Sequence, residues 1–238
     1  MATLAARGRL SAERRFFLSM AVAMAVCTFA GFARTYYLME YTGAADLPPA
    51  VHLHGLLFTA WVLLFGLQAG LISARRHDIH VMTGSVGIAL AAAMIMLGLY
   101  VAVTRTRPPA AAALTIEQFL IFPLIAIGLF ALFVAMAFAN RDRPDVHKRY
   151  MLIASINVIL PALARLTALL PFLPRGVIGG LIIANLFLLA LAIFDWRTLG
   201  RLHRATLIGG GITLLAEPLR FVIARSDWWP PIARMLMP

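Results

Sequence analysis

The chain has 238 residues, of which 62% are hydrophobic and 13% are charged, and its formal net charge is +11. Soluble domains average ~45–50% apolar and ~25% charged residues, so this composition argues against a water-soluble fold and is typical of an integral membrane protein. The single cysteine, Cys27, excludes a disulfide within the chain and argues against a zinc or iron–sulfur site built on thiolates.

The positive charge is explained by membrane topology rather than by nucleic-acid binding. Nearly all lysines and arginines lie in short segments between apolar runs, where the positive-inside rule places them. No basic patch is separate from the apolar runs, so we predict no nucleic-acid partner and take the lipid bilayer as the main partner.

The apolar runs predict one integral-membrane domain over residues 1–238, an all-α polytopic transmembrane helix bundle. A cytoplasmic basic head is expected at residues 1–15, the bundle at 16–224 and an outer-side tail at 225–238. In chain order, the helices are predicted at about residues 16–39, 50–73, 79–103, 115–139, 146–170, 177–194 and 202–224.

Seven helices are the favoured count and six are the alternative. The last helix is the weakest, because Gly209 to Gly211 and Pro218 interrupt it. In the fifth helix, Pro161 predicts a kink near Asn157, since proline cannot donate a backbone hydrogen bond.

The distribution of basic residues predicts an orientation. The N-terminal head and the loops after the second, fourth and sixth helices carry 13 of the 21 lysines and arginines, whereas the opposite side carries 6. This asymmetry predicts a bacterial inner (cytoplasmic) membrane protein with its N-terminus in the cytoplasm.

Three histidines occupy matching positions on the predicted cytoplasmic side. His80, His147 and His203 fall in the first turns of the third, fifth and seventh helices, and Asp78 and Asp145 are predicted N-caps. Imidazoles on different helices can converge, so this pattern predicts a metal ion held by the three histidines, or a haem b held by two of them. The alternative is that they are ordinary polar residues at the membrane edge.

The charged segment at residues 141–151 contains His147. Its basic residues are expected to hold a cytoplasmic loop in place; they are Arg141, Arg143, Lys148 and Arg149.

A second polar layer lies nearer the outer side. Arg165, Glu217 and Arg220 are ~21–27 Å from the cytoplasmic ends of their helices, at a rise of ~1.5 Å per residue. Glu217 and Arg220 are three residues apart and are predicted to pair, whereas the partner of Arg165 must come from another helix, a ligand or the interface. Ionisable residues at this depth indicate a functional path. The alternative is snorkelling to the headgroups, which we prefer for Arg34.

The second helix carries a stripe on one face, made by His54, Phe58, Trp61, Phe65 and Gln68. His54 leads the stripe, so it is expected to face the interior in preference to His52 and is a candidate cofactor-binding residue. Ordinary packing is the alternative reading of the stripe.

Three amides add to the polar inventory of the membrane segments. Gln68, Asn157 and Asn185 each need a hydrogen-bond partner at membrane depth.

Several of these residues carry a resemblance to a known family over roughly residues 52–165. They are His54-Gly55, Gln68, Arg76, His80, Gly84, the D-x-H-K-R-x-M run from Asp145 to Met151, and Arg165. The pattern resembles an uncharacterised family of bacterial predicted multi-pass membrane proteins. The resemblance groups His54, Gln68, His80, His147, Arg149 and Arg165 but implies no reaction.

A fainter similarity is to membrane b-type cytochromes, which implies haem between facing histidines. The chain departs from their pattern on the outer side, where only His52 and His54 are offered, both by one helix.

Three functions remain open. The first is a redox protein that binds haem or a metal through its histidines, with a quinone or another redox partner, and the share of histidines among the few polar residues favours it. The second is a transporter or binding protein for a small molecule or anion with a polar site in its outer half. The third is a structural or assembly subunit of a membrane complex.

Overall fold

The computed structural model describes residues 2–43, 46–105, 107 and 114–238, with side chains described from residue 10 onward. Its α-helices are α1 (Ala2–Phe32), α2 (Met39–Thr42), α3 (Pro49–Ser73), α4 (His77–Arg105), α5 (Ile116–Ala139), α6 (Pro144–Val158), α7 (Leu160–Leu166), α8 (Val177–Leu199), α9 (Arg204–Ala224) and α10 (Trp229–Leu236). A π-helical turn at Ala33–Tyr37 and a 3₁₀ turn at Thr167–Leu169 extend α1 and α7. The predicted all-α helix bundle is confirmed.

Six helices of the described chain are long and apolar enough to cross a membrane, namely α1, α3, α4, α5, α8 and α9. A seventh span is broken, because Pro144–Val158 and Leu160–Leu169 pass the same test together but bend by 51° at their junction. The count therefore agrees with the predicted seven spans, or with six if the bent pair does not cross.

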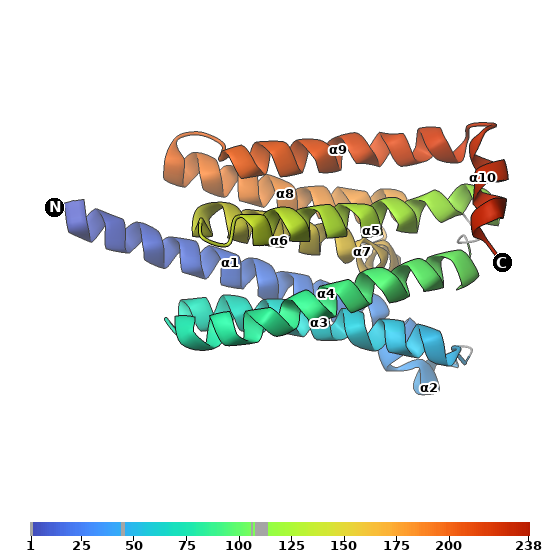
Figure 1. The fold of residues 1–238 in the computed structure, drawn as a ribbon, viewed down its shortest axis with the longest axis horizontal. Helices are drawn as coiled ribbons and strands as arrows, with labels where there is room; N and C mark the ends of the chain where they lie inside the picture. Colours follow the sequence, from blue (N-terminus) through green and yellow to red (C-terminus); the bar gives the residue numbers. More distant parts are fainter. Residues whose placement is uncertain (1, 44–45, 106, 108–113) are drawn as a thin grey trace.

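The spans run side by side along the long axis of the molecule, with the two termini at opposite ends (Figure 1). The long helices and α7 form an outer ring. Neighbouring helices in the ring are in contact in the order α1, α3, α4, α5, α9, α8 and α7, and a contact between α7 and α1 closes the ring. Inside them lies α6, which contacts α1, α5, α8 and α9. We call the end with the connections at 74–76, 140–143 and 200–203 the N-terminal end, and the end with α2 and α10 the C-terminal end.

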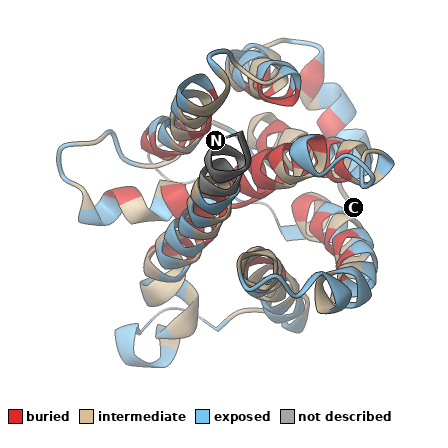
Figure 2. Cartoon of the chain, turned by 90° about the vertical axis from the view of Figure 1, so that its left-hand side faces the viewer, coloured by how far each residue is buried: buried red, intermediate tan, exposed pale blue. Residues whose placement is uncertain are grey.

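The central position of α6 follows from its sequence. Ten of its 15 residues are buried, and the stretch from Leu152 to Ile156 is at most 1% exposed. Viewed from the N-terminal end, the buried residues of the bundle line the facing sides of the helices (Figure 2). From α3, Trp61 reaches this core and donates from Nε1 to Ser155 Oγ at 3.2 Å.

The break between α6 and α7 confirms the kink predicted near Asn157. The first helix ends at Val158 and the next begins at Leu160. Pro161 has no N–H to offer to the Asn157 carbonyl four residues earlier, so the helical ladder is interrupted there.

The first helix begins earlier than predicted, and the last one is confirmed. The basic head is helical, since α1 begins at Ala2 and its first turns are rich in alanine, leucine and arginine, which favour a helix. The seventh helix, predicted at about residues 202–224, is observed as α9 and is continuous through Gly209 to Gly211 and Pro218, since packing against α5 and α6 outweighs their low helix propensity.

The tail forms the short helix α10, which packs across the C-terminal end of the bundle. Trp229 and Ala233 are its buried residues. Trp229 donates from Nε1 to the Glu117 carbonyl at 2.8 Å, and Arg234 lies 3.5 Å from the Glu117 carboxylate. The first turn of α5 is thus tied to the end of the chain.

The prediction that Asp78 and Asp145 are N-caps is wrong. Each helix begins one residue before its aspartate, at His77 and at Pro144, so each aspartate lies inside the first turn. Asp78 pairs instead with Arg76 at 3.3 Å, and Asp145 accepts a hydrogen bond from His203 at 3.0 Å. Side-chain partners nearby in space compete with the capping role.

Candidate functional site

A buried ion pair joins α6 to α8 at the N-terminal end. Arg149 donates from Nε at 3.0 Å and from Nη2 at 2.5 Å to Oδ1 of Asp195, and the two side chains are 2% and 0% exposed. The second Asp195 oxygen accepts from the His203 backbone N–H at 3.1 Å and the Thr206 hydroxyl at 2.6 Å. Arg149 also donates to the Asp145 carbonyl at 2.7 Å. Both carboxylate oxygens are satisfied, so this cluster fastens helices together.

The cluster corrects the prediction that Arg149 only holds a loop in place. Its guanidinium is buried because Asp195 neutralises it inside the bundle. The sequence contained one usable signal, since Asp195 is the only acidic residue of α8, and a buried carboxylate needs a cationic or hydrogen-bonding partner.

His203 is engaged at both ring nitrogens. It is the N-cap of α9, where its Nδ1 accepts from the Ala205 N–H at 3.1 Å. The proton therefore sits on Nε2, which donates to Asp145 Oδ2 at 3.0 Å. Among the described residues, no group of three or more His, Cys, Asp or Glu side chains is arranged to hold a metal ion. Both nitrogens of His203 are engaged within the protein, and the prediction that His80, His147 and His203 hold a metal or haem stays a prediction.

His147 offers one free nitrogen. Its Nδ1 donates to the Ala137 carbonyl at 2.9 Å, since a carbonyl can only accept, and this leaves the lone pair on Nε2. The ring packs edge-on against Phe138, with centroids 6.1 Å apart.

Gln68 finds its partners on α4, so the need for a partner at membrane depth is confirmed. Its Nε2 donates to Thr83 Oγ1 at 2.8 Å, and that hydroxyl donates to the Ile79 carbonyl at 2.7 Å. With the amide turned over, its nitrogen donates instead to Nδ1 of His80. The amide therefore lies between Thr83 and His80.

The stripe on α3 is mostly a packing surface. Trp61 is 2% exposed and meets Phe130 edge-to-face with centroids 4.9 Å apart. His54 lies against Phe58 at 4.0 Å, and its buried Nδ1 has no partner among the described residues. His52 is exposed, so the choice of His54 as the inward-facing histidine is confirmed, while its role as a cofactor ligand stays a prediction.

Asn157 connects the broken span to α9. Its Nδ2 donates to the Ile153 carbonyl at 2.9 Å and to Thr213 Oγ1 at 3.1 Å. Asn157 and Thr213 are 6% and 3% exposed. A polar contact between α6 and α9 therefore lies beside the break.

Three of the predicted intramembrane polar residues come together in the C-terminal half of the bundle. Asn185 of α8 donates from Nδ2 to Oε2 of Glu217 at 3.0 Å. Arg220 is 1% exposed and donates from Nε to the Ala216 carbonyl of its own helix at 3.3 Å. The ion pair predicted between Glu217 and Arg220 is not formed between these described side chains, because the carboxylate turns toward Asn185.

This group, which we call the α8–α9 polar site, contains unused hydrogen-bonding capacity. Four buried side-chain atoms in the described chain have no partner, and three of them are Asn185 Oδ1, Glu217 Oε1 and Arg220 Nη1. An unpaired buried polar atom costs about 1–3 kcal/mol, so native proteins rarely keep several in one place without a use. The site offers a ligand one cationic donor and two acceptors.

A line of polar side chains on α9 leads from the ion pair to this site. Thr206, Thr213, Glu217 and Arg220 follow one another at spacings of seven, four and three residues, which keeps them on one face of the helix. From Thr206 to Arg220 the helix rises ~21 Å, most of a membrane's hydrocarbon thickness. We call this line the polar column.

Arg165 is not part of the α8–α9 polar site. It donates from Nη1 to the Pro161 carbonyl at 3.0 Å, and its guanidinium lies over the Phe32 ring at 4.7 Å. The residue is exposed at the surface of the bundle. Its partner from another helix is therefore an aromatic ring, which attracts a cation through its π face.

Taken together, the apolar spans and their arrangement define a multi-pass integral membrane protein. Comparisons with models of protein families, with curated proteins and with solved structures find no match for the chain. A more specific function has to be argued from the geometry of its polar groups.

Proposed function

We propose that the protein is a transporter of a small polar solute, which binds at the α8–α9 polar site. The observation that carries this proposal is the set of three unpaired buried atoms on Asn185, Glu217 and Arg220. Ionisable groups in a membrane interior are costly and usually mark a substrate path. A solute at this site makes the hydrogen bonds that the protein alone leaves unmade.

Two further features support movement of the solute rather than binding alone. The polar column places Thr206, Thr213 and Glu217 on one face of α9. The Thr206 and Thr213 hydroxyls bind Asp195 and Asn157 in this structure, and they become partners for a solute when the helices rearrange. Beside it, the α6–α7 span bends by 51°, and broken spans recur in transporters as the elements that rearrange.

The test is uptake into liposomes that contain the purified protein. Labelled mixtures of amino acids, carboxylates and amines are offered to the wild type, to Arg220→Gln and to Arg225→Gln. Arg225 is the matched control, because it lies on the same side of the membrane but is exposed. We expect uptake by the wild type and by Arg225→Gln, and at least a tenfold loss in Arg220→Gln, equivalent to ~1.4 kcal/mol. Equal uptake by all three proteins contradicts the proposal.

A second candidate function, electron transfer through haem b, rests on the environment of His80 and His147. The Nδ1–H of His147 donates to the Ala137 carbonyl at 2.9 Å, which is the outer hydrogen bond that orients a ligating histidine. His80 differs, because the turned-over Gln68 amide donates to its Nδ1. The neutral ring then carries its proton on Nε2, and this proton must be displaced for His80 to bind iron. These two imidazoles are the ones that would hold the iron, which supplies one-electron chemistry toward a quinone or another redox partner.

This candidate is tested by the absorption spectrum of the protein purified from haem-supplied cells, with metal analysis. A Soret band that is lost in His147→Ala but kept in His77→Ala supports it, since His77 is exposed at the same end. A colourless, metal-free preparation that also fails to bind added haemin rules it out.

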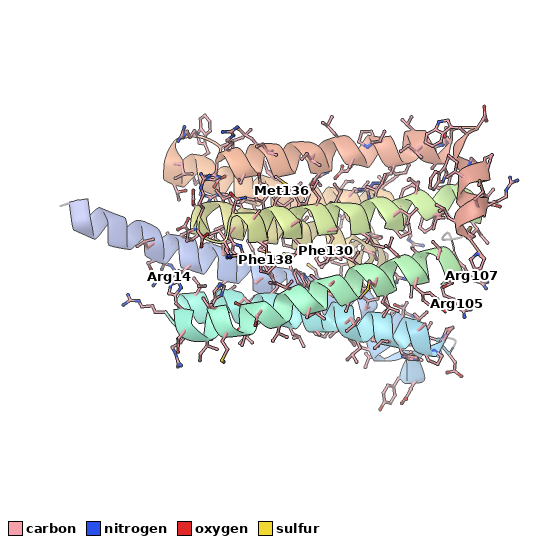
Figure 3. All side chains as sticks on the ribbon, viewed as in Figure 1. Arg14, Arg105, Arg107, Phe130, Met136 and Phe138 are labelled. Carbon is pink, nitrogen blue, oxygen red and sulfur yellow. The ribbon has the colours of Figure 1, made fainter. Side chains whose placement is uncertain are left out.

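For location, we infer the inner membrane of a bacterium, with the N-terminus in the cytoplasm. The support is the excess of basic residues on the N-terminal side, 13 against 6. Figure 3 places Arg14 toward the N-terminal end, and Arg105 and Arg107 at the opposite end. A C-terminal fusion to alkaline phosphatase should be active and one to green fluorescent protein dark, and the reverse result contradicts the orientation.

A further inference from the structure

The α8–α9 polar site combines one acidic and one basic residue that do not neutralise each other. Glu217 and Arg220 are three residues apart on α9, yet the carboxylate is turned to Asn185. The guanidinium is held by its own helix through the Ala216 carbonyl. Each charged group therefore has one hydrogen-bonded atom and one buried atom that has no partner in the described part of the chain.

The anchored atoms fix which atoms are free. Glu217 Oε2 is occupied by the Asn185 amide, and its buried Oε1 has no donor among the described residues. Arg220 uses Nε on the Ala216 carbonyl of its own helix, and its buried Nη1 has no acceptor among the described residues. The free Oδ1 of Asn185 adds a second acceptor.

This arrangement discriminates between ligands by charge. A simple anion pairs with Arg220 but adds a second negative charge beside Glu217. A simple cation pairs with Glu217 but adds a second positive charge beside Arg220. Either leaves an unbalanced charge in a medium of low dielectric, where the cost is several kcal/mol. A ligand that carries one positive and one negative charge pairs with both residues, and the net charge of the site stays zero.

Building on the proposed function, we propose that the solute is a small zwitterion of the amino-acid type. Its carboxylate accepts from Arg220 Nη1, and its ammonium group donates to Glu217 Oε1 and Asn185 Oδ1. The two charged residues are separated by ~4.5 Å of helix rise, which favours a ligand whose opposite charges are only a few bonds apart.

The test is thermal stabilisation of the full-length protein in lipid nanodiscs, since a ligand that binds only the folded state raises its Tm. The probes are the twenty common amino acids. Each one that raises the Tm is compared with its analogue lacking the amino group and its analogue lacking the carboxyl group, such as propionate and ethylammonium for alanine. At least one amino acid should raise the Tm, and neither of its single-charge analogues should do so at equal concentration.

Substitutions test whether the rise in Tm depends on the α8–α9 polar site. Glu217→Gln and Arg220→Gln should each weaken binding on the order of 10–100-fold, the loss of one charge-assisted hydrogen bond, while Arg225→Gln binds like the wild type. Because Arg220→Gln could unfold, the near-isosteric Glu217→Gln is decisive by itself.

Two outcomes overturn the inference. If a carboxylate or an amine alone binds as tightly as the amino acid and depends on Arg220, the substrate class is wrong, but the transport site stands. If no amino acid shifts the Tm, the zwitterion is excluded, and the uptake experiment with carboxylates and amines then decides the proposed function separately.

Discussion

Arg149 and Asp195, 46 residues apart in the chain, meet at 2.5 Å inside the bundle, whereas Glu217 and Arg220, one turn apart on α9, do not pair. The contrast separates two uses of buried charge. In the first pair both carboxylate oxygens are occupied, which suits a structural contact. In the second, both charged groups keep an unpaired atom, which suits a binding site.

The structural role of the first pair predicts a large loss of stability when one partner is removed. Arg149→Met leaves the buried Asp195 carboxylate without its cation, which should cost about 3–5 kcal/mol. The measurement is the Tm of the purified protein in detergent. The control is Arg76→Met, which breaks an exposed pair with Asp78 and should cost at most about 1 kcal/mol. Similar melting of the two variants would show that the buried pair does not fasten the helices.

Much of the architecture could be predicted from the sequence, because the length of an apolar run determines whether it can cross a membrane as a helix. The spans, the break at Pro161 and the burial of Trp61 all follow from local chemistry or periodicity. The Arg149–Asp195 pair could not be predicted, since no local pattern tells which distant side chain meets a charged residue.

The candidate site was only partly predictable for the same reason. Depth along the helix identified Asn185, Glu217 and Arg220 individually. Their grouping depends on the contact between α8 and α9, and Glu217 prefers Asn185 over its own neighbour Arg220. Conversely, the matching positions of His80, His147 and His203 along their helices carried no information about the direction of each ring.

The contact of α8 with α7 predicts a sharp intolerance at Gly180. A Cβ added there would lie 2.8 Å from the Ala164 backbone nitrogen and 2.9 Å from its Cα, so backbone has to move. Gly180→Ala should therefore destabilise the protein by about 1–3 kcal/mol. Gly128 has no atom within 4 Å of such a Cβ, and Gly128→Ala should be neutral or slightly stabilising in the same melting experiment. If Gly180→Ala is equally neutral, the helices are not this close.

The anchoring of α10 predicts a specific effect of the Trp229 indole. Trp229→Phe removes the hydrogen bond to the Glu117 carbonyl and should cost about 1 kcal/mol, while Trp228→Phe, at an exposed position, should cost little. The readout is the rate of cleavage of the C-terminal tail by a protease. Faster cleavage is expected for Trp229→Phe alone, and equal rates in the two variants would argue against the anchor.

The break between α6 and α7 predicts a separation of binding from transport. Pro161→Ala restores a donor for the Asn157 carbonyl and favours a straighter span. We expect the solute-dependent rise in Tm to remain, because the α8–α9 polar site is unchanged, and uptake to fall. Uptake at the wild-type rate would show that the break has no part in the transport cycle.

The most direct test of the account is chemical labelling of Glu217 by dicyclohexylcarbodiimide, which reacts with carboxyl groups accessible from the membrane phase. The extent of labelling is measured by mass spectrometry with and without a transported solute, with Glu117 at the C-terminal end as the internal reference. The account predicts that saturating solute protects Glu217 and leaves the reference unchanged. Labelling of Glu217 that is the same with and without saturating solute would contradict it.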